Sequence, residues 1–176
     1  MPVQVYSLYI FDRHTECIYS KQWVQPATPA SSTLPSTVTD QHRQTNGTEL
    51  AATAAEQLPP KPRRNKGADD AKLIFGTVFS LRNMVRKLGG DDDAFISFRT
   101  AQYKLHYYET PTNLRFALLT EPGALSMRNV LHQIYINLWV EYVVKNPLSP
   151  VEHKGGEGVR NEMFELGLDK FIRGLM

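Results

Sequence analysis

The stretch DDAKLIFGTVFSLRNMVRKL, residues 69–88, decides how this chain can fold. Wound as an α-helix at about 100° per residue, it gathers its apolar side chains into an arc of roughly 240°. A helix that packs on one sheet needs an apolar stripe only somewhat wider than about 100°. The surplus predicts that part of the arc faces the protein's own sheet and that a margin faces a partner protein. The alternative is a helix buried entirely inside its own domain, but a chain this short has few elements to cover it twice.

The two margins of this arc are the candidate interaction surface. One margin carries Phe75 and Phe79, and the other carries Leu73 and Met84, about 120° or more away on the helical wheel. Val78, at the centre of the arc, is expected to face the sheet. The phenylalanine margin is slightly favoured as the partner contact, because large aromatic side chains are enriched in interface cores.

Length and composition predict a single domain over residues 1–176 with one core. The net charge of +2 is close to balanced, which argues against nucleic-acid binding. One cysteine, Cys17, excludes an internal disulfide framework, and the N-terminal residues lack the pattern of a signal peptide. We therefore expect a cytoplasmic protein. No apolar window approaches the roughly 18 residues of a membrane span, so any membrane contact is expected to be peripheral.

Runs of apolar, β-branched and aromatic residues predict two groups of strands. Residues 3–11 and 16–24 flank a polar turn and are expected to form a hairpin. Residues 95–100, 103–110 and 114–120 follow one another closely and are expected to form an antiparallel meander. The sequence therefore predicts an antiparallel sheet of five strands.

Two further helices are predicted after the meander. The first can be capped by Ser126 and ends before Pro147, with apolar residues at i, i+3, i+4 and i+7. The second carries Phe164 and Leu168 on one face and is weakened by Gly167. The predicted order of elements is thus ββαβββαα, which describes an α+β fold.

Residues 25–67 differ in character from the rest of the chain. Six prolines interrupt a run rich in Thr, Ser, Ala and Gln, and no aromatic residue occurs between Trp23 and Phe75. Such a segment cannot bury enough apolar surface to offset the entropy lost on ordering, so we expect a disordered insert. Its basic end, residues 61–66, could touch anionic lipid, but a solvated run of charges is the simpler interpretation.

The residues that could carry chemistry form no recognisable constellation. The sequence contains no phosphate-binding loop, paired CxxC, HExxH or GxSxG. Cys17 has only His14 near it in sequence and is interpreted as a packed structural cysteine. His106 is placed on the strand face expected to be more open, and no second metal ligand stands at a suitable spacing. We therefore expect no catalytic residue, cofactor or metal site, and an interaction protein instead of an enzyme.

Four stretches resemble the small longin-type subunits of the TRAPP (trafficking protein particle) tethering complex, and the resemblance is closest to the Bet-five type of fungi. They are LYIFDRHTECIYSKQW (8–23), DDAKLIFGTVFSLRNMVRKL (69–88), YKLHYYETPT (103–112) and VLHQIYINLWVEYVVKNPLSP (130–150). The resemblance implies the longin or SNARE-like fold, a five-stranded antiparallel sheet with helices on its faces. The insert at 25–67 departs from the compact animal form of the family.

The resemblance also implies a function. Members of this family are non-catalytic core subunits of a multisubunit tethering factor that exchanges guanine nucleotide on a Rab GTPase of the Rab-one type, between endoplasmic reticulum and cis-Golgi. The implied partners are a second longin subunit of the synbindin type, flanking Bet-three-type subunits and, through the assembled complex, the Rab. The excess apolar surface of residues 69–88 agrees with such a partner.

Two other functions are compatible with the fold. A small chain of a coat adaptor complex would bind a large adaptor chain and cargo peptides. A free-standing enzyme is a more remote alternative. A longin SNARE is excluded, because the chain has neither a heptad segment nor a membrane anchor.

The composition of the insert yields a prediction about stability. Replacement of residues 26–66 by a short Gly/Ser linker should leave the melting temperature of the chain nearly unchanged, because the segment holds no core residues and its ends need only be bridged. Thermal unfolding followed by circular dichroism is the measurement. Precipitation of the shortened chain, or a large fall in its melting temperature, would show that the insert packs.

Overall fold

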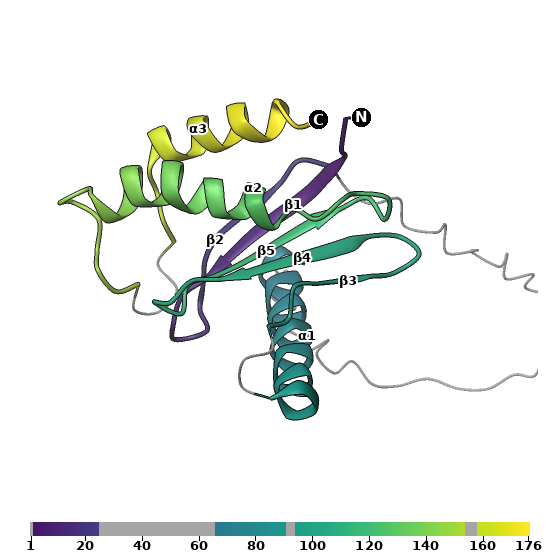
Figure 1. Ribbon diagram of the computed structural model, residues 1–176. Coiled ribbons are helices and arrows are strands. Elements are labelled where there is room, and N and C mark those ends of the chain that lie inside the picture. Colours follow the sequence, from purple (N-terminus) through teal and green to yellow (C-terminus); the bar gives the residue numbers. More distant parts are fainter. Residues whose placement is uncertain (1, 25–65, 91–93, 154–157) are drawn as a thin grey trace, which may run out of the picture. The chain divides into compact units, whose positions relative to one another are not determined.

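The computed structural model describes residues 2–24, 66–90, 94–153 and 158–176 (Figure 1). Residues 25–65, which make up nearly all of the predicted insert, lie outside the described residues. The helix that follows begins at Lys66, ahead of the predicted start at Asp69. The last two residues of the range predicted as insert therefore belong to the helix.

Five strands form one sheet in the order β2-β1-β5-β4-β3, and all neighbouring strands are antiparallel. They are β1 (Val5–Phe11), β2 (Cys17–Gln22), β3 (Ser97–Arg99), β4 (Lys104–Glu109) and β5 (Arg115–Thr120). This confirms the predicted five-stranded antiparallel sheet. Every residue of β1 is buried, and successive side chains of a strand point to opposite faces. Both faces of the sheet must therefore be covered.

Helices supply that cover on each side. They are α1 (Lys66–Gly89), α2 (Arg128–Gln133), η1 (Ile134–Val144) and α3 (Glu162–Arg173). α1 lies on one face of the sheet, and α2, η1 and α3 lie on the other (Figure 1). Since α2 runs directly into η1, the chain order is the predicted ββαβββαα. The predicted α+β fold of the longin type is confirmed.

The larger core lies between the sheet and the layer formed by α2, η1 and α3. Its sheet side is built from alternate residues of β1 and β5, which stack against fully buried side chains of the three helical segments. The largest of these buried side chains are Leu8, Ile10, Phe116, Leu118, Leu131, Ile134, Phe164, Leu168 and Ile172. This face of the sheet is closed to solvent over most of its length.

Polar contacts fix α3 in this layer. Asp169 accepts hydrogen bonds from Lys21 Nζ at 2.7 Å and from Trp23 Nε1 at 2.8 Å, which ties α3 to the end of β2. Asn161 caps the first turn of α3 with its side-chain oxygen, and its Nδ2 donates to the Tyr142 carbonyl of η1 at 2.6 Å. Charged and amide side chains thus fix how the last helix lies against the rest.

η1 is a π-helix, in which each N–H binds the carbonyl five residues earlier. The bond from Lys145 N to Val140 O, at 3.0 Å, has this spacing. η1 buries Ile134, Leu138, Trp139 and Val143. Trp139 stands four residues after Tyr135 and four before Val143, so helical spacing also places it on the packed face, although the prediction did not name it.

The placement of His106 corrects two predictions. His106 is only 1% exposed, because the start of α2 covers the strand face that was expected to be open. Its Nδ1 accepts from the Met127 backbone N–H at 3.4 Å, which leaves the ring proton on Nε2, 3.0 Å from Thr120 Oγ1. Met127 is the N-cap of α2 and no side chain caps it. The predicted cap Ser126 is therefore wrong, and His106 binds the helix start instead.

Burial of His106 predicts a pH-dependent stability. Burial, and then the charge of Lys104, lower the pKa of His106 from 6.5 to about 4. The unfolded chain therefore binds a proton at higher pH than the folded chain does, so the stabilisation is complete above pH 6.5 and is lost as the pH falls towards 4. The free energy of unfolding should fall by up to about 3 kcal/mol across this window.

Urea denaturation at several pH values between 7 and 4 measures this loss. His106→Gln should flatten the dependence, whereas His14→Gln, a change at an exposed histidine, should keep it. Glu109 and Asp169 do not account for the effect. Burial alone would raise the pKa of each carboxyl, but cationic and hydrogen-bonding neighbours hold the pKa of both below its ordinary value. Their contribution begins to fall only as the pH approaches the unfolded pKa values, 4.5 for Glu109 and 3.8 for Asp169, and therefore affects the acid end of the window alone. An unchanged slope in His106→Gln would contradict the assignment.

Candidate interaction surface

The centre of the apolar arc of α1 packs on the sheet, as predicted. Val78 is 3% exposed and lies in a cluster with Phe95, Leu105 and Tyr107. One side of the helix start is closed by Ala71, which packs with residues of β1 and β5. Of the described helices, α1 alone covers this face, so its two margins decide how much apolar surface remains outside.

The phenylalanine margin is divided between core and surface. The Phe75 ring lies 5.3 Å from the Phe11 ring and 5.9 Å from the Phe79 ring, measured between centroids. The Arg115 guanidinium lies 5.9 Å from the centroid of the same ring. Phe75 is thus half-buried against the sheet, whereas Phe79 is 46% exposed. Of this margin, only Phe79 is free for a partner.

The opposite margin is more exposed. Leu73 is 71% exposed and Met84 is 50% exposed. Leu88, one helical turn after Met84, is 82% exposed and extends the same side. These three residues, which we call the leucine margin, form an apolar row that no other part of the described chain covers. The helical wheel assigned Leu73 and Met84 to this margin but did not assign Leu88 to it.

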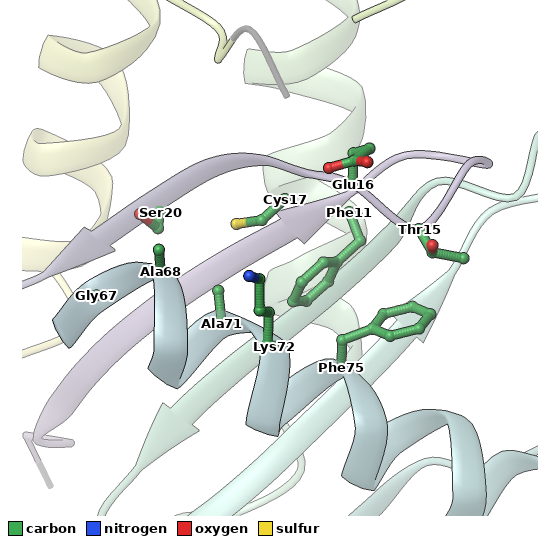
Figure 2. Close-up of a pocket in the computed structure, with 10 residues that line it drawn as sticks. All are labelled: Phe11, Thr15, Glu16, Cys17, Ser20, Gly67, Ala68, Ala71, Lys72 and Phe75. Carbon is green, nitrogen blue, oxygen red and sulfur yellow. The ribbon is translucent and has the colours of Figure 1, made fainter. Parts of the chain in front are cut away.

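A groove opens between the start of α1 and the hairpin of β1 and β2 (Figure 2). Its volume is about 650 Å³, and its walls include the adjacent rings of Phe11 and Phe75 and the Cys17 thiol. The Cys17 Sγ donates to the Tyr19 carbonyl at 3.5 Å. Burial raises the pKa of this thiol, which disfavours the thiolate that nucleophilic chemistry requires. Cys17 is half-buried in the wall, in agreement with its interpretation as a structural residue.

Metal sites and membrane spans are the other features to consider in the part of the chain that the structure describes. There, no group of three or more His, Cys, Asp or Glu side chains is placed to hold a metal ion. Over the same residues, no helix combines the length and the hydropathy that crossing a bilayer requires. The apolar margins of α1 remain the feature that calls for an explanation.

Residues 5–175 match the profile of the Sybindin-like family. The chain belongs to this family. It is 41% identical to Transport protein particle subunit bet5 of Schizosaccharomyces pombe, over 97% of each chain. It is 35% identical to human Trafficking protein particle complex subunit 1, over 97% of this chain and 93% of the relative. It is 32% identical to Trafficking protein particle complex subunit BET5 of Saccharomyces cerevisiae, over 94% of this chain and 86% of the relative.

Membership of the Sybindin-like family confirms the resemblance found in the sequence. The relatives bear the names of trafficking particle subunits, which agrees with the family inferred from the four quoted stretches. The family match extends over nearly the whole chain and includes α1 together with its margins. Partner residues on α1 remain a proposal.

The exposure pattern of α1 predicts which substitutions the isolated chain tolerates. Val78→Asp should unfold the chain, because it would bury an unpaired carboxylate against the sheet at a cost of several kcal/mol. That cost is roughly half or more of the free energy of unfolding of a typical domain. Phe79→Asp and Met84→Asp should keep the fold and change its stability by about 1 kcal/mol or less. Circular dichroism melts of the three variants are the measurement. Unfolding of all three would show that the margins are structural.

Proposed function

We propose that this chain is a non-catalytic core subunit of a TRAPP complex, a tethering factor that exchanges guanine nucleotide on a Rab-one-type GTPase in transport between endoplasmic reticulum and Golgi. The observation that carries the proposal is the uncovered leucine margin of α1 in a chain similar to trafficking particle subunits. The proposed location is the cytoplasm, peripheral to the cis-Golgi and endoplasmic reticulum membranes.

The leucine margin is the proposed contact with a second longin subunit of the synbindin type. Three large apolar side chains are exposed on this margin in one row. On the other margin Phe79 alone is exposed, because Phe75 packs against Phe11 and Arg115. Apolar side chains removed from water stabilise an association roughly in proportion to the area buried. The exposure of Leu73 and Met84 therefore favours their side of the helix over the phenylalanine margin.

A subunit of this kind needs no catalytic residue of its own. Nucleotide exchange requires a surface that stabilises the nucleotide-free GTPase, and several subunits can build it together. Within the described residues, the half-buried thiol of Cys17 and the buried ring of His106 are both engaged in the chain's own packing. This supports a structural contribution to the exchange assembly, with Bet-three-type subunits as further partners.

The small chain of a coat adaptor is the rival function, since it would use the same fold. The similarity to trafficking particle subunits extends over at least 86% of each relative named above. Similarity at this length to three such subunits favours the TRAPP assignment over the adaptor.

Pairing and exchange test the proposal in one experiment. The tagged chain is co-expressed with the synbindin-type and Bet-three-type subunits, and release of fluorescent GDP from the Rab is then followed. The wild-type chain should co-purify with these subunits, and the assembly, but not the lone chain, should accelerate release. Met84→Asp should weaken the affinity for the synbindin-type subunit roughly tenfold or more, and a tenfold loss of affinity is equivalent to about 1.4 kcal/mol.

Two variants serve as controls. Phe79→Asp changes the opposite margin, and Leu166→Asp changes an exposed leucine on α3; both should pair normally. Loss of pairing in Phe79→Asp alone would move the contact to the phenylalanine margin. Recovery of a large adaptor chain in place of the two subunits, or rapid release by the lone chain, would contradict the proposed function.

A further inference from the structure

A cavity of about 330 Å³ lies beside η1, on the side of the sheet opposite α1. Segments distant in sequence meet around it: the β1–β2 turn, the β4–β5 turn, η1, and the residues 149–153 that follow η1. Ligand pockets in proteins have volumes of roughly 300 to 1,000 Å³. The cavity is at the lower end of this range, which suits one large side chain.

η1 supplies an aromatic wall. Tyr135, Trp139 and Val143 stand four residues apart on the π-helix, and all three line the cavity. Trp139 is held from behind by T-shaped contacts with Phe116 and Phe164, at centroid distances of 6.2 and 5.6 Å. Stretches of π-helix are rare and frequently occur at functional sites. A wall of this composition can pack against an aliphatic stem and can attract a cation to a ring face.

The mouth of the cavity exposes apolar side chains to solvent. Val144, at the end of η1, is 62% exposed, and Val151 is 98% exposed; both line the cavity. Arg13 of the β1–β2 turn forms an ion pair with Glu152, which joins two sides of the mouth. The stem of an inserted side chain would cover the two valines.

Asp12 adds a carboxylate to the lining. It is only 8% exposed, and its Oδ1 accepts a backbone N–H of the turn at 2.9 Å. Among the described residues, no cation forms an ion pair with this carboxylate. Arg115 donates instead to the Asp12 backbone carbonyl and pairs with Glu109. Since Arg13 compensates Glu152, the charge of Asp12 remains in excess within the described lining.

From this combination we infer that the cavity binds an arginine side chain inserted by a protein partner. The guanidinium would meet the Asp12 carboxylate beside the rings of Tyr135 and Trp139. Guanidinium is planar, stacks on aromatic rings and pairs with carboxylates, whereas the ammonium of lysine is compact and more strongly hydrated. A neutral apolar side chain would leave the carboxylate covered without compensation, which is costly. The inference does not rest on the proposed TRAPP assignment, because α1 and its leucine margin lie on the other side of the sheet.

Proton–nitrogen NMR spectra of the full-length chain test the inference with short peptides. The probe is Thr-Ser-Arg-Ser-Thr with blocked ends, at millimolar concentration. Two matched peptides carry citrulline, the neutral analogue of arginine, or leucine in its place. The chain has two tryptophans, so the Trp139 indole signal reports on the cavity, and that of Trp23, which donates to Asp169, is the internal control.

The arginine peptide should move the Trp139 signal saturably and leave the Trp23 signal unchanged. It should bind at least roughly tenfold more tightly than either matched peptide, because only its side chain carries a charge for Asp12. Absence of a saturable shift, or equal binding of the citrulline peptide, would overturn the inference. Tighter binding of the leucine peptide would identify an apolar anchor instead and would also overturn it.

Variants of the chain locate the binding. Asp12→Asn retains an acceptor for the turn, so it should keep the fold and weaken the arginine peptide roughly tenfold. Val144→Arg adds a competing cation at an exposed position of the mouth and should weaken the peptide as well. Glu165→Gln, at an exposed carboxylate of α3 outside the lining, should bind like the wild-type chain. Unchanged binding in the folded Asp12→Asn and Val144→Arg variants would contradict the proposed site.

Two further arms separate other occupants. Lys154 directly follows the lining residue His153 in sequence and lies outside the described residues. If the peptide binds only after Lys154→Gln, the chain's own lysine competes for the cavity and the inference fails. If vesicles of phosphatidylcholine move the Trp139 signal and the peptide does not, the cavity recognises a lipid headgroup and the inference also fails.

Discussion

The burial of β1 is the constraint on which the rest of this structure depends. All seven residues of Val5–Phe11 are buried, with apolar or aromatic side chains on both sides of the strand. A sheet built around such a strand needs a covering layer on each face. Within the described ranges, three helical segments form one layer and α1 alone forms the other. One helix cannot shield both a sheet face and its own margins, so the exposed apolar surface follows from the connectivity of the fold.

Polar pairs fix the two layers at opposite parts of the sheet. Asp169 of α3 binds Lys21 and Trp23 at the end of β2. Glu109 of β4 binds Arg82 of α1 and Arg115 of β5, which connects α1 to the end of the sheet. Replacement of one partner in such a semi-buried group leaves the others without compensation, which costs more than the pair contributes in place. These contacts give α1 a defined orientation, and that orientation determines which margin points outward.

Local patterns were sufficient to predict the fold. Runs of apolar, β-branched and aromatic residues bounded by turns identified all five strands, and the helical period identified α1 and its buried centre at Val78. The pattern failed where a neighbour distant in sequence decides the outcome. His106 is buried because the start of α2 lies over it.

Gly167 shows the same limit. From the sequence, Gly167 was interpreted as a residue that weakens the last helix. A Cβ at this position would lie 2.9 Å from Leu138 Cδ2, so the glycine permits close packing of α3 on η1. Leu73, Phe79 and Met84, which the helical wheel placed on the margins of the arc, are exposed in the isolated chain, and their contact with a partner stays a prediction. The wheel could not show that Phe75 is held by Phe11 and Arg115, whose positions depend on the sheet. The Arg82–Glu109 pair joins residues 27 positions apart and had no local signal.

The size of the leucine margin limits what it can do alone. Full burial of a large apolar side chain is worth about 2 kcal/mol, so Leu73, Met84 and Leu88 together could supply about 6 kcal/mol at most. Association costs an estimated 4 to 15 kcal/mol in lost freedom of motion before any surplus appears as affinity. This row can therefore orient a partner but cannot hold a stable pair by itself. A lasting assembly must recruit additional apolar surface from this chain, such as the exposed side chain of Phe79 on the other margin of α1.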